Sequence, residues 1–277
     1  MNTRISDEQV AQYREKGYLV PDYRLPGEVL EAMRRAYDVL LDRNAHLKSD
    51  FLLGVHLPVS GAQGVQGSSE WLEFATHPDL MDMAARLIGE DIILWGTTVF
   101  GKPAVCGKGT PWHQDGDYYP IRPLETMSIW IALDDVSEEN GPMRFIPGSH
   151  REKKLYPHHR EEDPGFTIHD VCDAEHFDPA TAEDLIIEAG QVSFHDVYMI
   201  HGSRPNRTEN RRAALVVRLM PASSHYNHKL GESMGAKNTS HDYGSRPLFL
   251  VRGRDVCGRN DFEIGHPRLP EAPCEPT

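Results

Sequence analysis

The sequence predicts an α+β fold in which helices come first along the chain and many short strands follow. Up to residue 90, apolar side chains recur at helical spacing; beyond it, short runs rich in β-branched and aromatic residues alternate with Gly, Pro and Asn. No internal repeat of about 20–50 residues interrupts this order. Helices followed by strands indicate a β-sandwich or small barrel with helices packed outside it, and 277 residues suffice for a large core.

Three segments before residue 90 are expected to be helical. The first begins at Ser6, a suitable N-cap with Gln9 at the capping-box position, and ends at Gly17, after which an extended segment begins. Residues 25–43 carry apolar side chains on one helical face, and residues 77–89 form a third helix that ends in a glycine.

The strand-like segments are residues 91–100, 125–136, 142–149, 190–203 and 211–221. Asn140–Gly141 lies between two of them and predicts a hairpin turn. Residues 151–184 are a long polar insert, for which a functional lid or mobile loop and a solvated excursion are equally open interpretations. The tail, residues 267–277, is expected to be poorly ordered, which leaves residues 1–266 as one domain.

Composition excludes several classes of partner. The net charge of −13 argues against nucleic acid, whose phosphates would be repelled. No apolar run approaches the roughly 20 residues of a membrane-spanning helix, and the N-terminus lacks the apolar core of a secretion signal, so a cytoplasmic location without membrane contact is expected. The four cysteines contain no CxxC motif and indicate reduced thiols. The sequence does not indicate an oligomeric state.

The stretch "WHQDGDYYP", residues 112–120, places a histidine and an aspartate two positions apart. In a strand, His113 and Asp115 would project from one face while Gln114 points away. Alone, the pair is either an ordinary strand surface or two-thirds of a metal site. His201, at the end of an extended run, is the best third ligand, and His195 is a rival ligand for which a packing or supporting role is favoured.

Two histidines and one carboxylate on one side of a metal form the facial triad of non-haem iron(II) oxygenases. A zinc hydrolase can use a similar ligand set, so the triad alone does not identify the metal. Arg212 follows His201 by eleven residues and could hold the distal carboxylate of 2-oxoglutarate in a two-pronged contact, with Ser203 donating a hydroxyl. Strand parity lets only one of Arg211 and Arg212 face the pocket, and spacing favours Arg212. Arg218 is interpreted as a solvated or paired strand charge.

Several motifs in order resemble the phytanoyl-CoA dioxygenase family of Fe(II)/2-oxoglutarate-dependent oxygenases. They are "WHQD" with an aromatic residue shortly after, "IWIALDDVSEENGPMRFIPGSH", "HGSRPN" followed by an arginine and a hydrophobic strand, and the opening "SDEQVAQYREKGYLV". The resemblance covers roughly residues 5–220. It implies a double-stranded β-helix (jelly-roll, cupin-like) core with flanking N-terminal helices.

The resemblance also implies roles for individual residues. Trp130 would line the cofactor pocket, and strand parity places Ser128 and Ala132 on its face. Related halogenases replace the carboxylate ligand with a small residue, but Asp115 fills that place here, so hydroxylation or a related oxidation is expected. The iron ligands would be His113, Asp115 and His201, and the 2-oxoglutarate contacts would be Arg212, Ser203, Trp130 and Lys102.

The activity implied is oxidative decarboxylation of 2-oxoglutarate to succinate and CO₂, with Fe(II) and O₂, coupled to hydroxylation of an unactivated C–H bond in a small metabolite. The acidic charge and the lack of an obvious lysine cluster make a coenzyme A thioester less attractive. The alternative is a non-catalytic metal-binding β-domain acting as a sensor or scaffold, which need not retain Arg212. The insert histidines His158, His159, His169 and His176 are interpreted as solvated, and the candidate substrate residues are Asp117, Tyr118, Tyr119, Tyr198 and Arg122.

Overall fold

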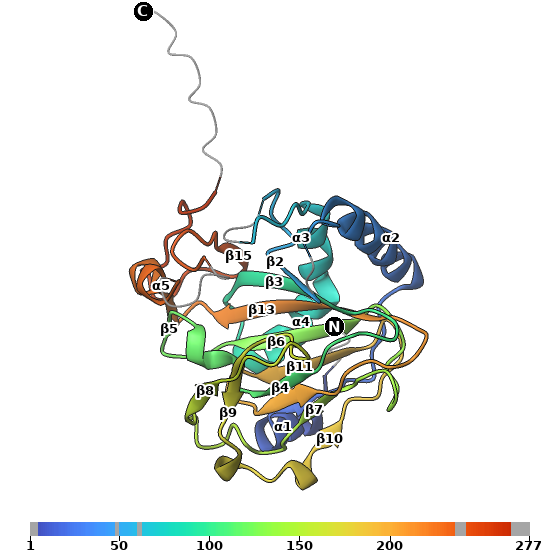
Figure 1. Cartoon of the computed structure of the whole chain (residues 1–277). Helices are drawn as coiled ribbons and strands as arrows, with labels where there is room; N and C mark the ends of the chain where they lie inside the picture. The colour runs from blue at the N-terminus through green and yellow to red at the C-terminus, as the bar shows by residue number, and fades with distance from the viewer. Residues whose placement is uncertain (1–4, 48–49, 60–62, 236–241, 267–277) are drawn as a thin grey trace, which may run out of the picture.

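Two antiparallel sheets face each other in a computed structural model that describes residues 5–47, 50–59, 63–235 and 242–266 (Figure 1). The large, seven-stranded sheet has the order β1 (Tyr18–Leu19), β11 (Val192–Asp196), β6 (Met127–Ala132), β13 (Arg212–Pro221), β3 (Ile92–Lys102) and β15 (Phe249–Arg252), and β2 (Phe51–Leu53) also pairs with β3. The small sheet has the order β10 (Glu183–Asp184), β7 (Met143–Phe145), β12 (His201–Ser203) and β4 (Thr110–His113). This arrangement confirms the predicted jelly-roll core.

The three predicted helices are present, and the first begins and ends at its predicted capping residues. In α1 (Asp7–Lys16), the Ser6 hydroxyl accepts from the Gln9 backbone N–H at 3.3 Å, and the Gln9 side chain accepts from the Ser6 N–H at 3.0 Å. Gly17 ends the helix with φ 84°, a left-handed conformation that favours glycine. The second and third predicted helices are α2 (Gly27–Arg43) and α4 (Pro78–Ile88).

Strand alternation sorts the large sheet into an outer and an inner face. On β13, Ala213, Leu215 and Val217 belong to the cluster that includes Met33 of α2 and Leu80 of α4, so this face packs on the helices. The alternate residues face the small sheet, where Trp130, Ala132, Ala214 and Val216 pack with Met143 and Phe145. Figure 1 shows the small sheet in front of the large one and α4 behind it. The space between the sheets holds the cavity described below.

The hairpin expected at Asn140–Gly141 is absent, because the strands on either side belong to different sheets. β6 pairs with β11 and β13, whereas β7 pairs with β10 and β12. The connection crosses between the sheets instead, with Asn140 accepting from the Ser137 N–H and donating to the Asp135 carbonyl. The chain does bend here, with Gly141 at φ 78°, but the pairing of the flanking strands depends on contacts far away in the sequence.

Residues 151–184 form ordered structure over the small sheet. A two-stranded ribbon, β8 (His158–Arg160) with β9 (Asp170–Cys172), is followed by the short 3-10 helices η2 (Ala174–His176) and η3 (Pro179–Thr181) and then by β10. Figure 1 shows the ribbon in front of β4. The second two-stranded ribbon is β5 (Ile121–Arg122) with β14 (His225–Tyr226).

The elements that were not predicted include α3 (Glu70–Ala75), α5 (His228–Gly235), the edge strand β15 and the short strands β2, β5, β8, β9, β10 and β14. Among the described helices, none combines the length and apolar character needed to cross a bilayer. The three cysteines in the described ranges are free, whereas Cys274 and the tail 267–277 lie outside those ranges.

Gly202, in the strand that pairs with β4, tests the close packing of the small sheet. We expect Gly202→Ala to lower the free energy of unfolding by about 1–3 kcal/mol, because a methyl group would lie 2.9 Å from the Thr110 carbonyl oxygen and 3.1 Å from that of Pro111. Gly27→Ala is the matched control, since an added methyl group there meets nothing within 4 Å. Denaturant unfolding of both variants checks this; equal stabilities would contradict it.

Candidate metal and 2-oxoglutarate site

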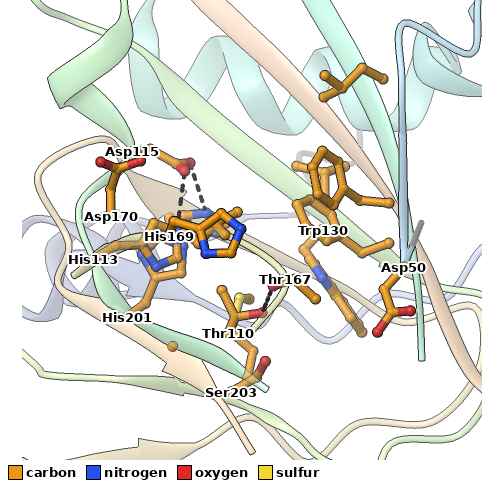
Figure 2. Close-up of a pocket in the computed structure, with 18 of the residues that line it drawn as sticks. Asp50, Thr110, His113, Asp115, Trp130, Thr167, His169, Asp170, His201 and Ser203 are labelled. Carbon is orange, nitrogen blue, oxygen red and sulfur yellow. Dashed lines mark hydrogen bonds and ion pairs between the residues drawn. The ribbon is translucent and has the colours of Figure 1, made fainter. Parts of the chain in front are cut away.

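Three metal-binding side chains meet at one end of the cavity. His201 on β12 lies directly opposite His113 on β4, and their ring centroids are 4.2 Å apart. The Asp115 Oδ1 atom lies 3.6 Å from His113 Nε2, and one ligand atom from each of the three residues lies within 4.8 Å of the others. Figure 2 shows the three side chains pointing toward one another. The structure therefore brings together the predicted triad.

Asp115 lies just beyond the end of the predicted strand. β4 ends at His113, and Asp115 is the first residue of the 3-10 helix η1 (Asp115–Tyr118). Gln114 between them is extended, with φ −118° and ψ 131°, so His113 and Asp115 project to one side as predicted while Gln114 points away. The Ser128 hydroxyl donates to Asp115 Oδ2 at 3.4 Å and helps to orient it.

Backbone carbonyls set the protonation pattern of both histidines. His113 Nδ1 lies 2.9 Å from the Pro111 carbonyl oxygen, and His201 Nδ1 lies 3.0 Å from that of Met199. A carbonyl can only accept, so each Nδ1 carries the hydrogen and each Nε2 keeps its lone pair. Fixing the second ring nitrogen in this way orients an imidazole for a metal.

Burial and charge keep the triad in its metal-binding form. Burial lowers the pKa of His201 well below its ordinary value, and the nearby His113 adds to this, so the neutral imidazole is favoured. Burial alone would raise the pKa of Asp115. The close contact with His113, whose Nε2 lies 3.6 Å from Oδ1, and the positive charge of Arg218 outweigh burial and hold the pKa of Asp115 well below its usual range.

The opposite end of the cavity carries a buried guanidinium. Arg212 is 2% exposed, donates through Nη2 to the Gly141 carbonyl and lies with Cζ 5.4 Å from the Trp130 ring centroid. Its Nε is buried without a hydrogen-bond partner among the described residues. Burial lowers the pKa of Arg212 to about 10, so it remains charged at neutral pH. An unpartnered buried donor on a cation suits an incoming carboxylate.

Lys102 lies directly opposite Arg212 across the β3–β13 ladder, so both side chains point into the cavity. It is 4% exposed and donates through Nζ to the Lys108 carbonyl. Burial and the charge of Arg212 lower the pKa of Lys102 to about 6. Ser203 lines the same part of the cavity beside Thr110, its partner in the β12–β4 ladder.

The cavity has a volume of about 400 Å³ and lies between the two sheets. Figure 2 shows the triad at one end and Trp130 with Asp50 at the other. The insert forms part of its wall through Arg160, Thr167, Ile168, His169 and Asp170. His169 was interpreted as solvated, but its side chain is half-buried against the cavity.

The proposed substrate residues are only partly brought to this cavity. Tyr119 lines it, whereas Asp117, Arg122 and Tyr198 do not. Asp117 lies exposed on the outer side of η1, and Arg122 folds back onto the carbonyls of its own chain segment. Tyr198 packs against an apolar cluster that includes Val197. The Tyr118 side chain lies outside the described part of the structure.

Two residues near the triad have roles that sequence reasoning missed or left open. Arg218 was interpreted as a solvated or paired strand charge, but it is 9% exposed and lines the cavity. Its sequence parity with Arg212 was the available signal, because residues 212, 214, 216 and 218 share a strand face. His195 lies with Nε2 3.9 Å from Asp115 Oδ2, and burial lowers its pKa to about 4. His195 thus lies beside the candidate ligand Asp115, and its supporting role stays a prediction.

Gln114, between two triad residues, joins the metal end to the insert. Its side chain is fully buried and donates to the Lys154 carbonyl at 3.0 Å and the Tyr198 carbonyl at 2.7 Å, and it accepts from the Tyr156 N–H at 2.8 Å. Its own N–H donates to His158 Nε2 at 3.1 Å. The residue predicted to point away from the metal therefore holds the insert in place.

Comparisons with known proteins agree on one family. The model of the family "Phytanoyl-CoA dioxygenase (PhyH)" matches residues 13–214. The human peroxisomal phytanoyl-CoA dioxygenase is 26% identical over 249 residues, which cover 81% of this chain and 71% of that protein. The "Probable alpha-ketoglutarate-dependent hypophosphite dioxygenase" of Stutzerimonas stutzeri is 32% identical over 180 residues, covering 64% of this chain and 58% of the relative.

A solved structure agrees with these relatives. The epimerase SnoN in complex with Fe³⁺, alpha ketoglutarate and nogalamycin RO superposes with a TM-score of 0.62 and 25% identity, over 80% of this chain and 85% of that one. The likeness extends to a protein that holds iron and the keto acid together.

Replacing Gln114 by Leu tests the link between the triad segment and the insert. We expect Gln114→Leu to lower the free energy of unfolding by at least about 2 kcal/mol, because two carbonyls and one N–H lose their buried partner. Gln9→Leu is the control, since it removes one solvent-exposed capping bond and should cost about 1 kcal/mol or less. Thermal unfolding compares them, and equal losses would show that the buried bonds contribute nothing.

Proposed function

The chain belongs to the phytanoyl-CoA dioxygenase family of Fe(II)/2-oxoglutarate-dependent oxygenases, and we propose that it hydroxylates an unactivated C–H bond of a small metabolite. Its cofactors are Fe(II), 2-oxoglutarate and O₂, and the keto acid leaves as succinate and CO₂. The observation that carries the proposal is the position of the His113–Asp115–His201 cluster and the Arg212 guanidinium at opposite ends of one cavity.

The donor set at the triad fits a ferrous ion. Two neutral imidazole Nε2 atoms and one ionised carboxylate occupy one side of a metal and leave the other side for a keto acid and O₂. Bound iron and 2-oxoglutarate supply the oxidising chemistry, while the protein supplies position and a dry cavity. His113, Asp115 and His201 would hold the ion.

The far end of the cavity fits the distal carboxylate of 2-oxoglutarate. The buried Nε of Arg212 has no hydrogen-bond partner among the described residues, so a carboxylate there would satisfy it. Ser203 and Lys102 line the cavity nearby and would add donors, and Trp130 would form the wall beside the keto acid. A sensor without catalysis would not need to retain this anchor.

The size of the cavity supports a small substrate. About 400 Å³ accommodates 2-oxoglutarate and a small second molecule. The names of the relatives indicate an acyl-CoA for one protein and hypophosphite for another, so membership of the family leaves the substrate open. The insert residues and Tyr119 would exclude water and orient the metabolite.

Purified protein with Fe(II), 2-oxoglutarate and ascorbate under air tests the activity. We expect O₂-dependent succinate formation, slow alone and faster when a substrate is present. Activity that persists without O₂ would instead indicate a hydrolase. Absence of succinate with iron demonstrably bound would favour a metal-binding sensor.

Two variants separate the metal from the keto acid. His201→Ala should abolish iron binding, because it removes one of three ligands. Arg212→Ala should leave iron in place but weaken 2-oxoglutarate at least about 30-fold, the usual effect of truncating a buried charged contact. Anaerobic titrations with Fe(II) and then with 2-oxoglutarate measure both affinities. Near-normal keto acid affinity in Arg212→Ala would refute the anchor assignment.

The pKa of Lys102 predicts how 2-oxoglutarate affinity depends on pH. Free Lys102 has a pKa of about 6 and is mostly neutral at pH 7, but a bound dianion would raise that pKa. Binding should therefore take up a proton, and affinity should fall as pH rises above about 6, until the raised pKa is passed. Calorimetry in buffers of different ionisation enthalpy detects the proton. Lys102→Met should abolish the uptake, and unchanged uptake in that variant would exclude Lys102 as its source.

A further inference from the structure

The inner face of β13 carries a second arginine that the proposed cofactor contacts do not use. Arg212, Val216 and Arg218 all line the cavity, and the two arginines are six residues apart. A strand rises about 3.4 Å per residue, so their Cα atoms are about 20 Å apart. Arg218 pairs with Ser128, whose hydroxyl contacts Asp115, and it therefore lies at the triad end. Arg212 pairs with Lys102 at the other end.

Arg218 is a buried cation with neutral contacts. Its Nε donates to the Tyr119 hydroxyl at 2.7 Å and its Nη1 donates to the Thr98 hydroxyl at 2.6 Å. It forms no ion pair with a carboxylate of the described residues. Burial raises the pKa of Tyr119 well above its ordinary value, so this phenol stays neutral and cannot balance the charge. A guanidinium buried among neutral groups is costly unless an anion joins it.

Asp115 is the carboxylate that acts on Arg218, but it would serve as a metal ligand once iron is bound. In the metal-free protein, burial acts to lower the pKa of Arg218, whereas Tyr119 and the Asp115 carboxylate raise it. The net effect is a pKa above the ordinary value. In the loaded site, the two charges of Fe(II) and the one of Arg212 are balanced by Asp115 and the two charges of 2-oxoglutarate. The other charged side chains that line the cavity balance in pairs. Lys102 offsets Asp50 at the far end, and Arg160 offsets Asp170 on the insert. Arg218 is then left without a counter-charge.

We propose that Arg218 binds an oxyanionic group of the substrate, so that the substrate is an organic acid held by this group with a nearby C–H bond at the iron. This inference rests on the proposed function and assigns the substrate class. With its distal carboxylate at Arg212, 2-oxoglutarate would leave the triad end beside Arg218 for the second molecule. Tyr119 and Thr98 act as positioning residues, because each accepts a hydrogen bond from one nitrogen of the guanidinium of Arg218, which lines the cavity.

Matched small probes test the proposal. Butyrate, propylphosphonate and butyramide have similar size but differ in charge, and each is titrated calorimetrically into anaerobic protein already saturated with Fe(II) and 2-oxoglutarate. Bound 2-oxoglutarate occupies Arg212, so a preference for acids reports on another cation. We expect at least one acid to bind at least about tenfold more tightly than the amide. Whichever of the two acids binds more tightly indicates whether the substrate carries a carboxylate or a phosphonate or phosphate group.

Variants assign the preference to Arg218. Arg218→Met should remove it, and Arg218→Lys should keep part of it, because the charge remains while the planar fork is lost. Arg252→Met is the control: this arginine pairs with Asp82 and Glu90 on the surface, and its loss changes net charge equally. Affinity for 2-oxoglutarate should change less than about twofold in all three variants.

Several outcomes would overturn the proposal. Equal binding of acid and amide would do so, as would an acid preference that survives in Arg218→Met. Loss of iron or of 2-oxoglutarate affinity in that variant would instead make Arg218 a support for Asp115 or part of the cofactor site. Because the titrations do not require turnover, they remain decisive if no succinate is formed. Succinate formation without an acid preference would leave the proposed function intact and remove only this inference.

Discussion

The pairing of β12 with β4 is the constraint on which the site depends. It sets His201 opposite His113 and brings their rings to 4.2 Å between centroids. In both residues, Nδ1 meets the carbonyl two residues earlier in the chain, so the same backbone that forms the ladder also sets the tautomer. Only the carboxylate comes from outside the sheet. A slip of one residue between these strands would turn one imidazole away from the other.

The large sheet carries two buried arginines on its inner face. β13 buries Ala213, Leu215 and Val217 against the helices, and burial of that apolar face offsets part of the cost of two guanidiniums on the opposite face. Because alternation places Arg212 and Arg218 on the same side but six residues apart, each end of the cavity receives one positive charge. One strand would thereby supply both anion-binding positions of the proposed function.

The sequence predicted those features that short-range patterns determine. The capping residues of α1, the alternation along β6 and β13, and the ligand types of the triad were all readable locally. Features that depend on distant contacts were not: Asn140–Gly141 looks like a hairpin turn, yet β6 and β7 join different sheets. Asp115 was assigned to a strand because nothing in "HQD" shows that the strand ends at His113. The burial of Arg218 likewise depends on Thr98 and Tyr119, which lie far from it in the sequence.

The contacts of the insert with β4 bear on how the cavity is closed. At one end of β4, Gln114 binds the backbone of Lys154 and Tyr156. At the other end, the Thr110 hydroxyl meets that of Thr167 at 2.8 Å, and Gly109 exchanges backbone hydrogen bonds with residues 165 and 167. A lid that opens freely would be attached at one end only, whereas this segment is held along the strand that carries His113. These contacts favour a fixed wall over a lid, since raising the insert would expose donors and acceptors on the segment that bears two of the three candidate metal ligands.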